Sequence, residues 1–217
     1  NLEGVERAVA AGSYRRRKET VGDLDILVVC GDSHDVMEPF VEFEDVVDVI
    51  SQGETRSSVY LRGDFQVDLR VVSSESYGAA MKYFTGSKEH NVACRQRAIE
   101  RGLKINEYGV FREEDEQGED PVAGEDEREI YELIDMQYVP PELREDRGEV
   151  EAAANGELPD LVGYDDLRGE LHSHTTATDG SYELREMVEA AREFGHEYLG
   201  VTDHSKEMSM ADGLDAD

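Results

Sequence analysis

Residues 12–29 read GSYRRRKETVGDLDILVV and decide the fold of the first part of the chain. The segment Leu24–Val29 is rich in Leu, Ile and Val, which predicts a β-strand in a mixed α/β fold. Side chains at positions i and i+2 of a strand point the same way, so Asp23 and Asp25 present two carboxylates on one face. Carboxylate oxygens are ligands that hard divalent cations such as Mg²⁺ prefer. The stretch therefore predicts a strand that begins with a metal-binding pair of aspartates.

Residues on both sides of this pair complete a candidate phosphate site. Phe65–Val72 alternates apolar and polar residues like a second strand, and it carries Asp68 as a third carboxylate. Three acids can hold two metals about 3.5–4 Å apart, the geometry of in-line phosphoryl transfer. The turn at Gly12 and Ser13 offers backbone groups and a hydroxyl to a triphosphate, and Arg16 adds a permanently charged partner. An exposed acidic strand edge is the alternative interpretation of these aspartates.

The arrangement resembles the nucleotidyltransferase superfamily, and Gly12–Asp25 resembles the palm of family X DNA polymerases, the polymerase-beta-like group. Residues 83–91, YFTGSKEHN, with Arg95 resemble the nucleotide-selection subdomain of that family, and Ile105–Gly109 resembles the strand beyond it. Tyr83 and Phe84 form an aromatic pair beside a glycine turn, suited to packing on a sugar and a base.

The resemblance implies a role for each matching residue. Asp23, Asp25 and Asp68 are expected to be catalytic ligands of Mg²⁺ or Mn²⁺, and Arg95 is expected to contact the template side of bound DNA. The residues expected to bind the incoming dNTP are Gly12, Ser13, Arg16, Gly22, Tyr83, Phe84, Gly86 and Asn91, with the Asn91 amide at a base edge. Gln66 departs from the pattern, since eukaryotic members carry arginine at this position.

A second constellation lies in residues 172–181, HSHTTATDGS, and 201–205, VTDHS. His172 and His174 share one face of a predicted strand, and a transition metal suits two imidazoles at that spacing. The spacing resembles the start of a PHP (polymerase and histidinol phosphatase) domain, a (β/α) barrel that hydrolyses phosphoesters with Mn²⁺ or Zn²⁺. The resemblance implies a metal site whose ligands are His172, His174, Asp179 and His204. Asp203 is expected to hold these ligands in place without binding the metal itself.

These resemblances predict an α/β protein in four parts. We expect an α+β nucleotidyltransferase palm at 1–72, truncated at its N-terminus, and a mostly helical, thumb-like nucleotide-selection subdomain at 73–147. A linker is expected at 148–167 and the first part of a PHP barrel at 168–217. We expect the chain to be a piece of a longer protein.

The hydrophobic pattern predicts further elements and leaves some residues without a role. We expect strands at Ser58–Leu61, Gly169–His174 and Tyr198–Val201, and helices near 36–43, 91–101, 127–135 and 182–194. His34, His90 and His196 match no motif and are expected at the surface.

The charge is strongly acidic and unevenly distributed. Lys+Arg is 22 and Asp+Glu is 52, a net charge of −30, which taken alone argues against nucleic-acid or anionic-membrane partners. Residues 1–111 hold 19 acids and 14 bases, a net of −5, and the remaining residues hold 33 acids and 8 bases, a net of −25. Such a surface is typical of halophile proteomes, so we expect a haloarchaeal source. Two cysteines favour a reducing, cytoplasmic location.

The function expected from these observations is templated DNA synthesis in repair or gap filling, with an attached PHP-type 3′–5′ exonuclease or phosphoesterase. The expected partners are gapped or primer–template DNA and dNTPs, with the protein acting as a monomer and binding no membrane. Three alternatives remain open: a PHP phosphoesterase with a non-catalytic polymerase-like domain, a small-molecule nucleotidyltransferase, and a non-enzymatic acidic interaction protein.

Overall fold

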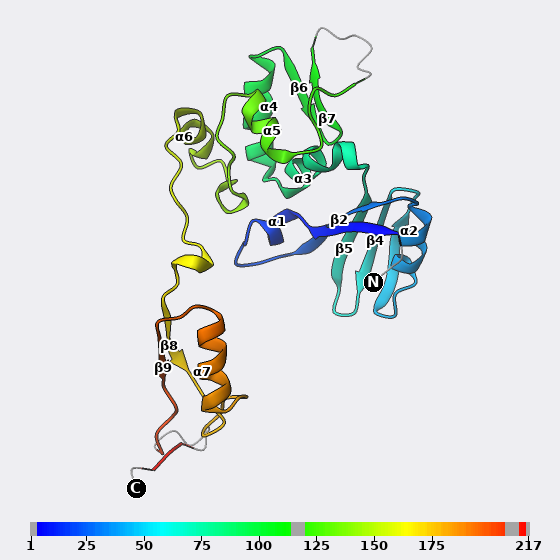
Figure 1. Ribbon diagram of the computed structural model, residues 1–217. Helices are drawn as coiled ribbons and strands as arrows, with labels where there is room; N and C mark the ends of the chain where they lie inside the picture. Colours follow the sequence, from blue (N-terminus) through cyan, green and yellow to red (C-terminus); the bar gives the residue numbers. More distant parts are fainter. Residues whose placement is uncertain (1–3, 114–119, 207–212, 216–217) are drawn as a thin grey trace. The chain divides into compact units, whose positions relative to one another are not determined.

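The strand predicted from Leu24–Val29 is β2 (Asp23–Cys30), and it lies inside a five-stranded sheet (Figure 1). The structure is a computed structural model that describes residues 4–113, 120–206 and 213–215. It forms two units, Asn1–Leu158 and Pro159–Asp217. Within the described residues, the helices are too short or too polar to cross a membrane.

The first unit contains a sheet subdomain, residues 4–72, and a helical subdomain, residues 73–158. The elements of the sheet subdomain are β1 (Val5–Ala10), α1 (Gly12–Arg15), β2 (Asp23–Cys30), α2 (His34–Val41), β3 (Val46–Gln52), β4 (Arg56–Leu61) and β5 (Phe65–Val71). Those of the helical subdomain are η1 (Ser74–Ser76), α3 (Tyr77–Thr85), α4 (Lys88–Ile99), β6 (Leu103–Asn106), β7 (Gly109–Arg112), α5 (Glu127–Leu133), η2 (Pro141–Leu143) and α6 (Glu149–Asn155).

The sheet is mixed and has the order β1-β2-β5-β4-β3, with β2 and β5 parallel and the other pairs antiparallel. The interior strand β2 is buried on both faces. Leu27 packs with Ala80 and Met81 of α3, whereas Val28 packs in the cluster that contains Val36 of α2. Burial on two faces explains why the strand has a continuous apolar run rather than an alternating one.

The two edge strands, β1 and β3, are not among the strands expected from the sequence. β1 includes Glu6 and Arg7, and β3 is exposed along nearly all of its length. Edge strands bury little surface and commonly carry charges, so their sequences lack the apolar pattern of a central strand.

The helical subdomain has its own core, to which α4 contributes both polar and apolar residues. Val92 and Ile99 of this helix are 53% and 52% exposed. The buried residues of α4 are His90, Asn91, Cys94 and Ala98. The helix thus buries polar side chains that have partners inside the subdomain.

The expectation that His90 lies at the surface is wrong. Its ring is fully buried, with Nδ1 2.6 Å from Glu149 Oε1 and Nε2 2.9 Å from the Tyr131 hydroxyl. Burial and the nearby charges of Lys82 and Arg144 lower the pKa of His90 to about 2. The ring is therefore neutral, and since a carboxylate only accepts, Nδ1–H donates to Glu149 while Tyr131 donates to Nε2.

The expected linker at 148–167 begins too early. Residues Glu149–Asn155 form helix α6, and Val150 and Ala153 are part of the core of the helical subdomain. The Gln137 N–H also donates to the Ala153 carbonyl. The two units separate after Leu158. Val150 and Ala153 lie three positions apart and therefore share one face of the helix.

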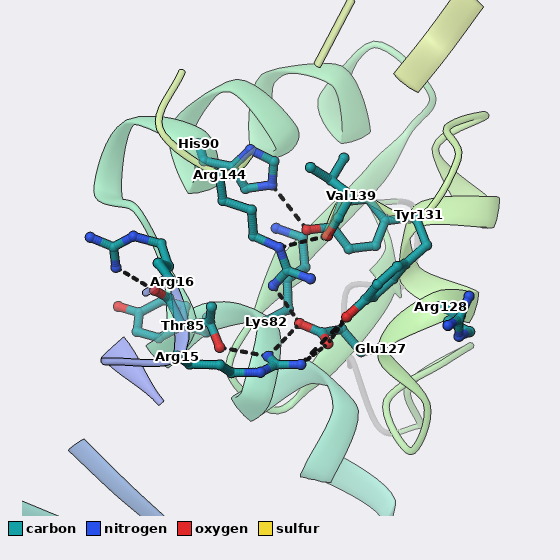
Figure 2. A network of polar contacts seen from close by, with 12 residues as sticks. Arg15, Arg16, Lys82, Thr85, His90, Glu127, Arg128, Tyr131, Val139 and Arg144 are labelled. Carbon is teal, nitrogen blue, oxygen red and sulfur yellow. Dashed lines mark hydrogen bonds and ion pairs between the residues drawn. The ribbon is translucent and has the colours of Figure 1, made fainter. Parts of the chain in front are cut away.

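A network of buried ions joins the two subdomains of the first unit (Figure 2). The carboxylate of Glu127 lies 2.8 Å from Arg15 of α1 and 2.5 Å from Arg144, whose side chain is fully buried. Arg15 also donates to the Thr85 hydroxyl at the end of α3. Burial alone would raise the pKa of Glu127, but Arg144 and Arg15 lower it to about 2. The network therefore holds the end of α3 against α1.

The second unit is a β–α–β arrangement. It contains η3 (Tyr164–Asp166), β8 (Gly169–Ser173), α7 (Leu184–Glu193) and β9 (Tyr198–Val201), with β8 and β9 parallel. These elements agree with the expected strand, helix and strand. The helix begins after Glu183, whose backbone N–H donates to the Glu186 carboxylate in the first turn.

Because Glu127 is the carboxylate that Arg15 and Arg144 share, its removal should strongly lower the stability of the protein. In a Glu127→Gln variant the desolvated Arg144 and Arg15 lose their counter-charge, so the free energy of unfolding at pH 7 should fall by about 3–5 kcal/mol. Chemical denaturation measures the difference. Glu142→Gln is the matched control, because Glu142 pairs with Arg17 at the surface, and it should cost less than about 1 kcal/mol. Equal effects of the two substitutions would contradict the role given to Glu127.

Candidate active site

The register of the two parallel strands sets the carboxylates side by side. Asp25 of β2 lies opposite Asp68 of β5, and Asp23 lies opposite Gln66. Asp23 and Asp25 share one face because they are two positions apart on the same strand. The three acids that the sequence analysis singled out are thus neighbours at one end of the sheet.

The electrostatics of this cluster favour a cation. Burial raises the pKa of Asp25 to about 6, and the charges of Asp23 and Asp68 add to the shift. Asp68 accepts hydrogen bonds from the Ser58 hydroxyl and, at 3.1 Å, from the Gln66 amide. These donors hold the Asp68 carboxylate without neutralising it. An all-oxygen, anionic donor set of this kind fits Mg²⁺ or Mn²⁺.

Gly12 is required by the approach of Asp25. A Cβ at position 12 would lie 2.4 Å from Asp25 Oδ2, and Gly12 has a φ of +60°. The Ala11 N–H donates to the Asp25 carbonyl oxygen at 2.8 Å. The absence of a side chain therefore lets helix α1 begin directly against the carboxylate of Asp25.

A cavity of about 340 Å³ opens beside the aspartates and brings most of the predicted nucleotide-binding residues together. Two expected site residues, Gly22 and Asp68, are not among those that line it. Lys88 and Thr85 line it and were not predicted, although Lys88 directly follows the Gly-Ser turn of the aromatic motif. The lining residues are Gly12, Ser13, Arg16, Asp23, Asp25, Tyr83, Phe84, Thr85, Gly86, Lys88, Asn91 and Arg95.

Residues of the helical subdomain hold the guanidinium of Arg16 at this cavity. Its Nε donates to Glu145 Oε1 at 2.8 Å, and Nη1 donates to the Thr85 carbonyl oxygen at 2.5 Å. The guanidinium has five N–H donors, and these two bonds use only part of that set. Since Arg16 lines the cavity, it can offer further donors to an anionic ligand there.

Ring contacts hold Tyr83 and Phe84 in place, whereas hydrogen bonds hold the side chain of Asn91. The rings of Tyr83 and Phe84 make an edge contact with centroids 5.0 Å apart, and the guanidinium of Arg70 lies 4.3 Å from the centre of the Phe84 ring. The Asn91 side-chain amide forms hydrogen bonds within the helical subdomain, and these bonds set its orientation at the cavity. Arg95 donates to the Asn91 carbonyl oxygen and is otherwise exposed.

The basic run 15–18 is not a free patch of positive charge. Arg15 pairs with Glu127, Arg17 with Glu142, and both Arg16 and Lys18 with Glu145. Each basic residue in this run has a carboxylate from residues 127–145 as a partner. The positive charge beside the aspartates is therefore largely compensated within the protein.

In the second unit, three of the four predicted metal ligands come together. The ligand atoms of His174, Asp179 and His204 lie within 4.8 Å of one another. Asp179 lies between the two imidazoles, with an oxygen 3.3 Å from His174 Nδ1 and another 3.3 Å from His204 Nε2. His174 Nδ1 is buried and has no hydrogen-bond partner among the described residues. An unpartnered nitrogen beside a carboxylate fits a transition metal.

His172 and Asp203 take different positions around this trio. His172 lies outside the three-residue cluster, with its ring centroid 5.2 Å from that of His174. Asp203 accepts hydrogen bonds from the backbone N–H of Thr175 and from the hydroxyls of Thr175 and Thr178. These bonds lower the pKa of Asp203. Asp203 thus connects the loop after β8 to the end of β9, beside His204.

The burial of Asp25 and its repulsion by Asp23 and Asp68 predict that Asp25→Asn stabilises the metal-free protein. The folded-state pKa of about 6 exceeds the ordinary 3.8, so wild-type stability falls as the pH rises from 3.8 to 6 and the penalty is complete above 6. The variant should gain about 1–2 kcal/mol at pH 7.5, after allowance for solvent screening, and the gain should vanish near pH 4.

Denaturation in a chelating buffer at both pH values measures this gain. Asp48→Asn is the control, since Asp48 is exposed on β3, and it removes one negative charge without relieving the cluster. An Asp25→Asn variant that is no more stable than Asp48→Asn at pH 7.5 would contradict the claim that burial and like charges destabilise the ionised Asp25.

Comparison with known proteins shows what the chain is similar to. Residues 80–145 match the model of the DNA polymerase beta thumb. The chain is 40% identical over 209 residues to DNA polymerase/3′-5′ exonuclease PolX of Bacillus subtilis, covering 95% of this chain and 36% of that protein. It is 27% identical over 162 residues to rat DNA polymerase lambda, covering 63% of this chain and 28% of that protein. The chain thus spans about a third of the length of these relatives.

The fold is also similar to a solved structure. Leishmania infantum polymerase beta in a ternary P/T complex matches with a TM-score of 0.55 and 26% identity, covering 64% of this chain and 67% of that one. The mixed sheet and the helical subdomain after it thus agree with a polymerase-beta-like fold. By sequence and by fold, the chain is a homologue of the family X DNA polymerases, with a polymerase-beta-type thumb at residues 80–145.

Proposed function

We propose that residues 4–158 form the catalytic core of a DNA-templated DNA polymerase that fills gaps in DNA by two-metal nucleotidyl transfer. One observation carries this proposal: a single cavity unites the Asp23 and Asp25 end of the sheet with Arg16, Tyr83 and Asn91 of separate elements. Carboxylates for metals, a guanidinium for phosphates and aromatic rings for a sugar and a base are the parts that a dNTP site needs.

The residues of the cavity have separable tasks in this reaction. Ser13 and Arg16 hold the triphosphate, Lys88 adds a charge, and Tyr83 with Phe84 packs on the sugar and base. Mg²⁺ or Mn²⁺ bound by the three aspartates supplies charge neutralisation at the α-phosphate and lowers the pKa of the attacking hydroxyl. The primer 3′-oxygen forms a bond to the α-phosphorus as the bond to the β-phosphate oxygen breaks, and pyrophosphate leaves.

Two alternatives fit the site less well. A small-molecule nucleotidyltransferase shares the Gly-Ser turn and the aspartates, but it does not require the thumb segment that holds Tyr83 and Asn91 against them. A phosphoesterase with a non-catalytic polymerase-like domain has no use for a partly buried aspartate beside two further carboxylates, an arrangement that raises the pKa of Asp25 first by burial and then by repulsion. Both alternatives predict that the protein does not extend a primer.

The acidic composition fits this proposal if the protein works in concentrated salt. We propose a monomer in the cytoplasm of a halophile, where molar salt shortens the Debye length to about 3 Å. At that distance the net charge of −30 repels DNA only at direct contacts. Binding of DNA and nucleotide then depends on the contacts made in the cavity.

Primer extension tests the proposed reaction. The full-length protein should extend a gapped primer–template in high salt with Mg²⁺ or Mn²⁺. Asp23→Ala or Asp25→Ala should lower the rate by about a thousandfold or more, because each removes a ligand from the site that stabilises transition-state charge. Asp48→Ala is the control of equal charge change. Synthesis retained by either site variant would contradict the assignment.

For the second unit we propose the opening part of a PHP-type domain that hydrolyses phosphoesters, including the 3′ end of DNA. The grouping of His174, Asp179 and His204 supports this, and the Bacillus subtilis relative has 3′-5′ exonuclease in its name. Mixed nitrogen and oxygen ligands suit Mn²⁺ or Zn²⁺. We propose His172 as a further ligand; its side chain lies outside the group formed by His174, Asp179 and His204.

Metal content tests this second site separately. The full-length His174→Ala/His204→Ala double variant should retain less Mn²⁺ or Zn²⁺ after dialysis than wild type and should lose 3′-end hydrolysis. Primer extension should continue, because the variant leaves Asp23, Asp25 and Asp68 intact. His34→Ala, at an exposed residue of α2, is the control. Unchanged metal content and hydrolysis would overturn the proposal for the second unit.

A further inference from the structure

Glu145 is a carboxylate that pairs with the guanidinium proposed to hold the triphosphate. Its Oε1 accepts a hydrogen bond from Arg16 Nε at 2.8 Å, and its Oε2 lies 3.3 Å from Lys18 Nζ. Arg16 lines the nucleotide cavity, whereas Glu145 is not among the lining residues. A negative charge near a triphosphate site weakens binding, because like charges repel. The charge of Glu145 therefore does not by itself explain why this residue lies beside Arg16.

The backbone at Glu145 is fixed by the residue before it. Arg144 is fully buried, and its guanidinium pairs with Glu127. The Arg144 carbonyl oxygen accepts a hydrogen bond from the Ser87 N–H at 3.0 Å. Glu145 thus follows a residue that is anchored to the turn at Gly86 and Ser87, and Gly86 lines the cavity.

Two bonds hold the guanidinium of Arg16 by different nitrogens. Nε donates to Glu145, and Nη1 donates to the Thr85 carbonyl oxygen at 2.5 Å (Figure 2). A Cβ at position 86 would lie 3.2 Å from Arg16 Nη1, so Gly86 leaves room for this approach. Because the guanidinium is a rigid plane, fixing two of its nitrogens also fixes the third, Nη2. Among the described residues, these bonds use two of its five N–H donors.

We propose that Glu145 is a positioning residue that holds Arg16 so that the remaining N–H donors of Nη1 and Nη2 face the phosphates of the incoming nucleotide. The inference rests on the proposed polymerase function. Glu145 acts through the reach of its carboxylate rather than through its charge. Without this contact the guanidinium turns about its bond to Thr85, and nucleotide binding has to restore the lost order.

Two substitutions separate reach from charge. Glu145→Gln keeps the length of the side chain and an amide oxygen that accepts from Nε–H, but it removes the charge. Glu145→Asp keeps the charge on a side chain that is one methylene shorter. If Glu145 positions Arg16, the Gln variant binds nucleotide like wild type and the Asp variant binds it weakly. If Glu145 only compensates the charges of Arg16 and Lys18, the order of the two variants is reversed.

The test is single-turnover extension of a gapped primer–template by the full-length protein in high salt, which gives the apparent Kd of dNTP separately from the maximal rate. Glu145→Ala and Glu145→Asp should raise the Kd by about tenfold or more, the effect of losing one charge-assisted hydrogen bond to phosphate. Their maximal rates should change by less than about threefold, because Arg16 binds the triphosphate equally before and during the reaction. Glu145→Gln should stay within about threefold of wild type in Kd, since salt screens the lost charge.

A double variant shows whether Glu145 acts through Arg16. In an Arg16→Ala background, Glu145→Ala should change the Kd of dNTP by less than about threefold, because the group that it positions is gone. The same effect in both backgrounds would overturn the inference. Glu142→Ala is the matched control, since Glu142 pairs with Arg17 at the surface, and it should keep the wild-type Kd.

Thermal unfolding of each variant shows whether the fold is kept, as expected for a side chain that is 20% exposed. If Glu145→Ala does not fold, the Asp and Gln variants decide between reach and charge. A wild-type Kd in the Asp variant would overturn the inference, as would a Gln variant that binds dNTP tenfold more weakly, and the proposed polymerase function would stand in both cases. A wild-type protein that extends no primer would overturn the proposed function itself.

Discussion

The partial burial of Asp25 beside the carboxylates of Asp23 and Asp68 is the constraint around which the first unit is organised. Parallel pairing sets Asp25 opposite Asp68, and burial raises the pKa of Asp25 to about 6. Gly12 lets helix α1 approach this carboxylate, and Gln66 helps to hold Asp68. Each feature keeps the charges together instead of separating them. A fold that keeps these carboxylates together at one end of the sheet, at a cost in stability, is suited to bind cations there.

The site also requires contacts that hold the sheet subdomain against the helical subdomain. Glu127 bridges Arg15 and Arg144, and the same α1 presents Arg16 to Thr85 and Glu145. These ion pairs set the end of α3 beside the aspartates, which creates the cavity. They also compensate positive charge that the surface beside the aspartates would otherwise display. Buried pairs of this kind specify an arrangement more than they stabilise it.

The sequence was informative where the pattern is local. The strand β2, its aspartate pair and the aromatic motif each lie within a few consecutive residues, and the structure brings most of their members to one cavity. Long-range partners were not predictable, because no local pattern shows that His90 meets Glu149. Helix α6 was missed for the same reason, since its small apolar face is defined only by the core it joins. The buried Lys82 likewise looks ordinary in sequence.

The account depends most directly on the claim that cations relieve the carboxylate repulsion. Thermal unfolding of wild type and Asp25→Asn, both with His174→Ala to remove the second site, tests it with and without Mn²⁺ and a non-hydrolysable dNTP. The account predicts that the order of stability reverses: the variant is more stable in chelator, and wild type is more stable with metal and nucleotide, by about 2–3 kcal/mol at a hundredfold excess over Kd. Equal stabilisation of both proteins by Mn²⁺ and nucleotide would contradict it.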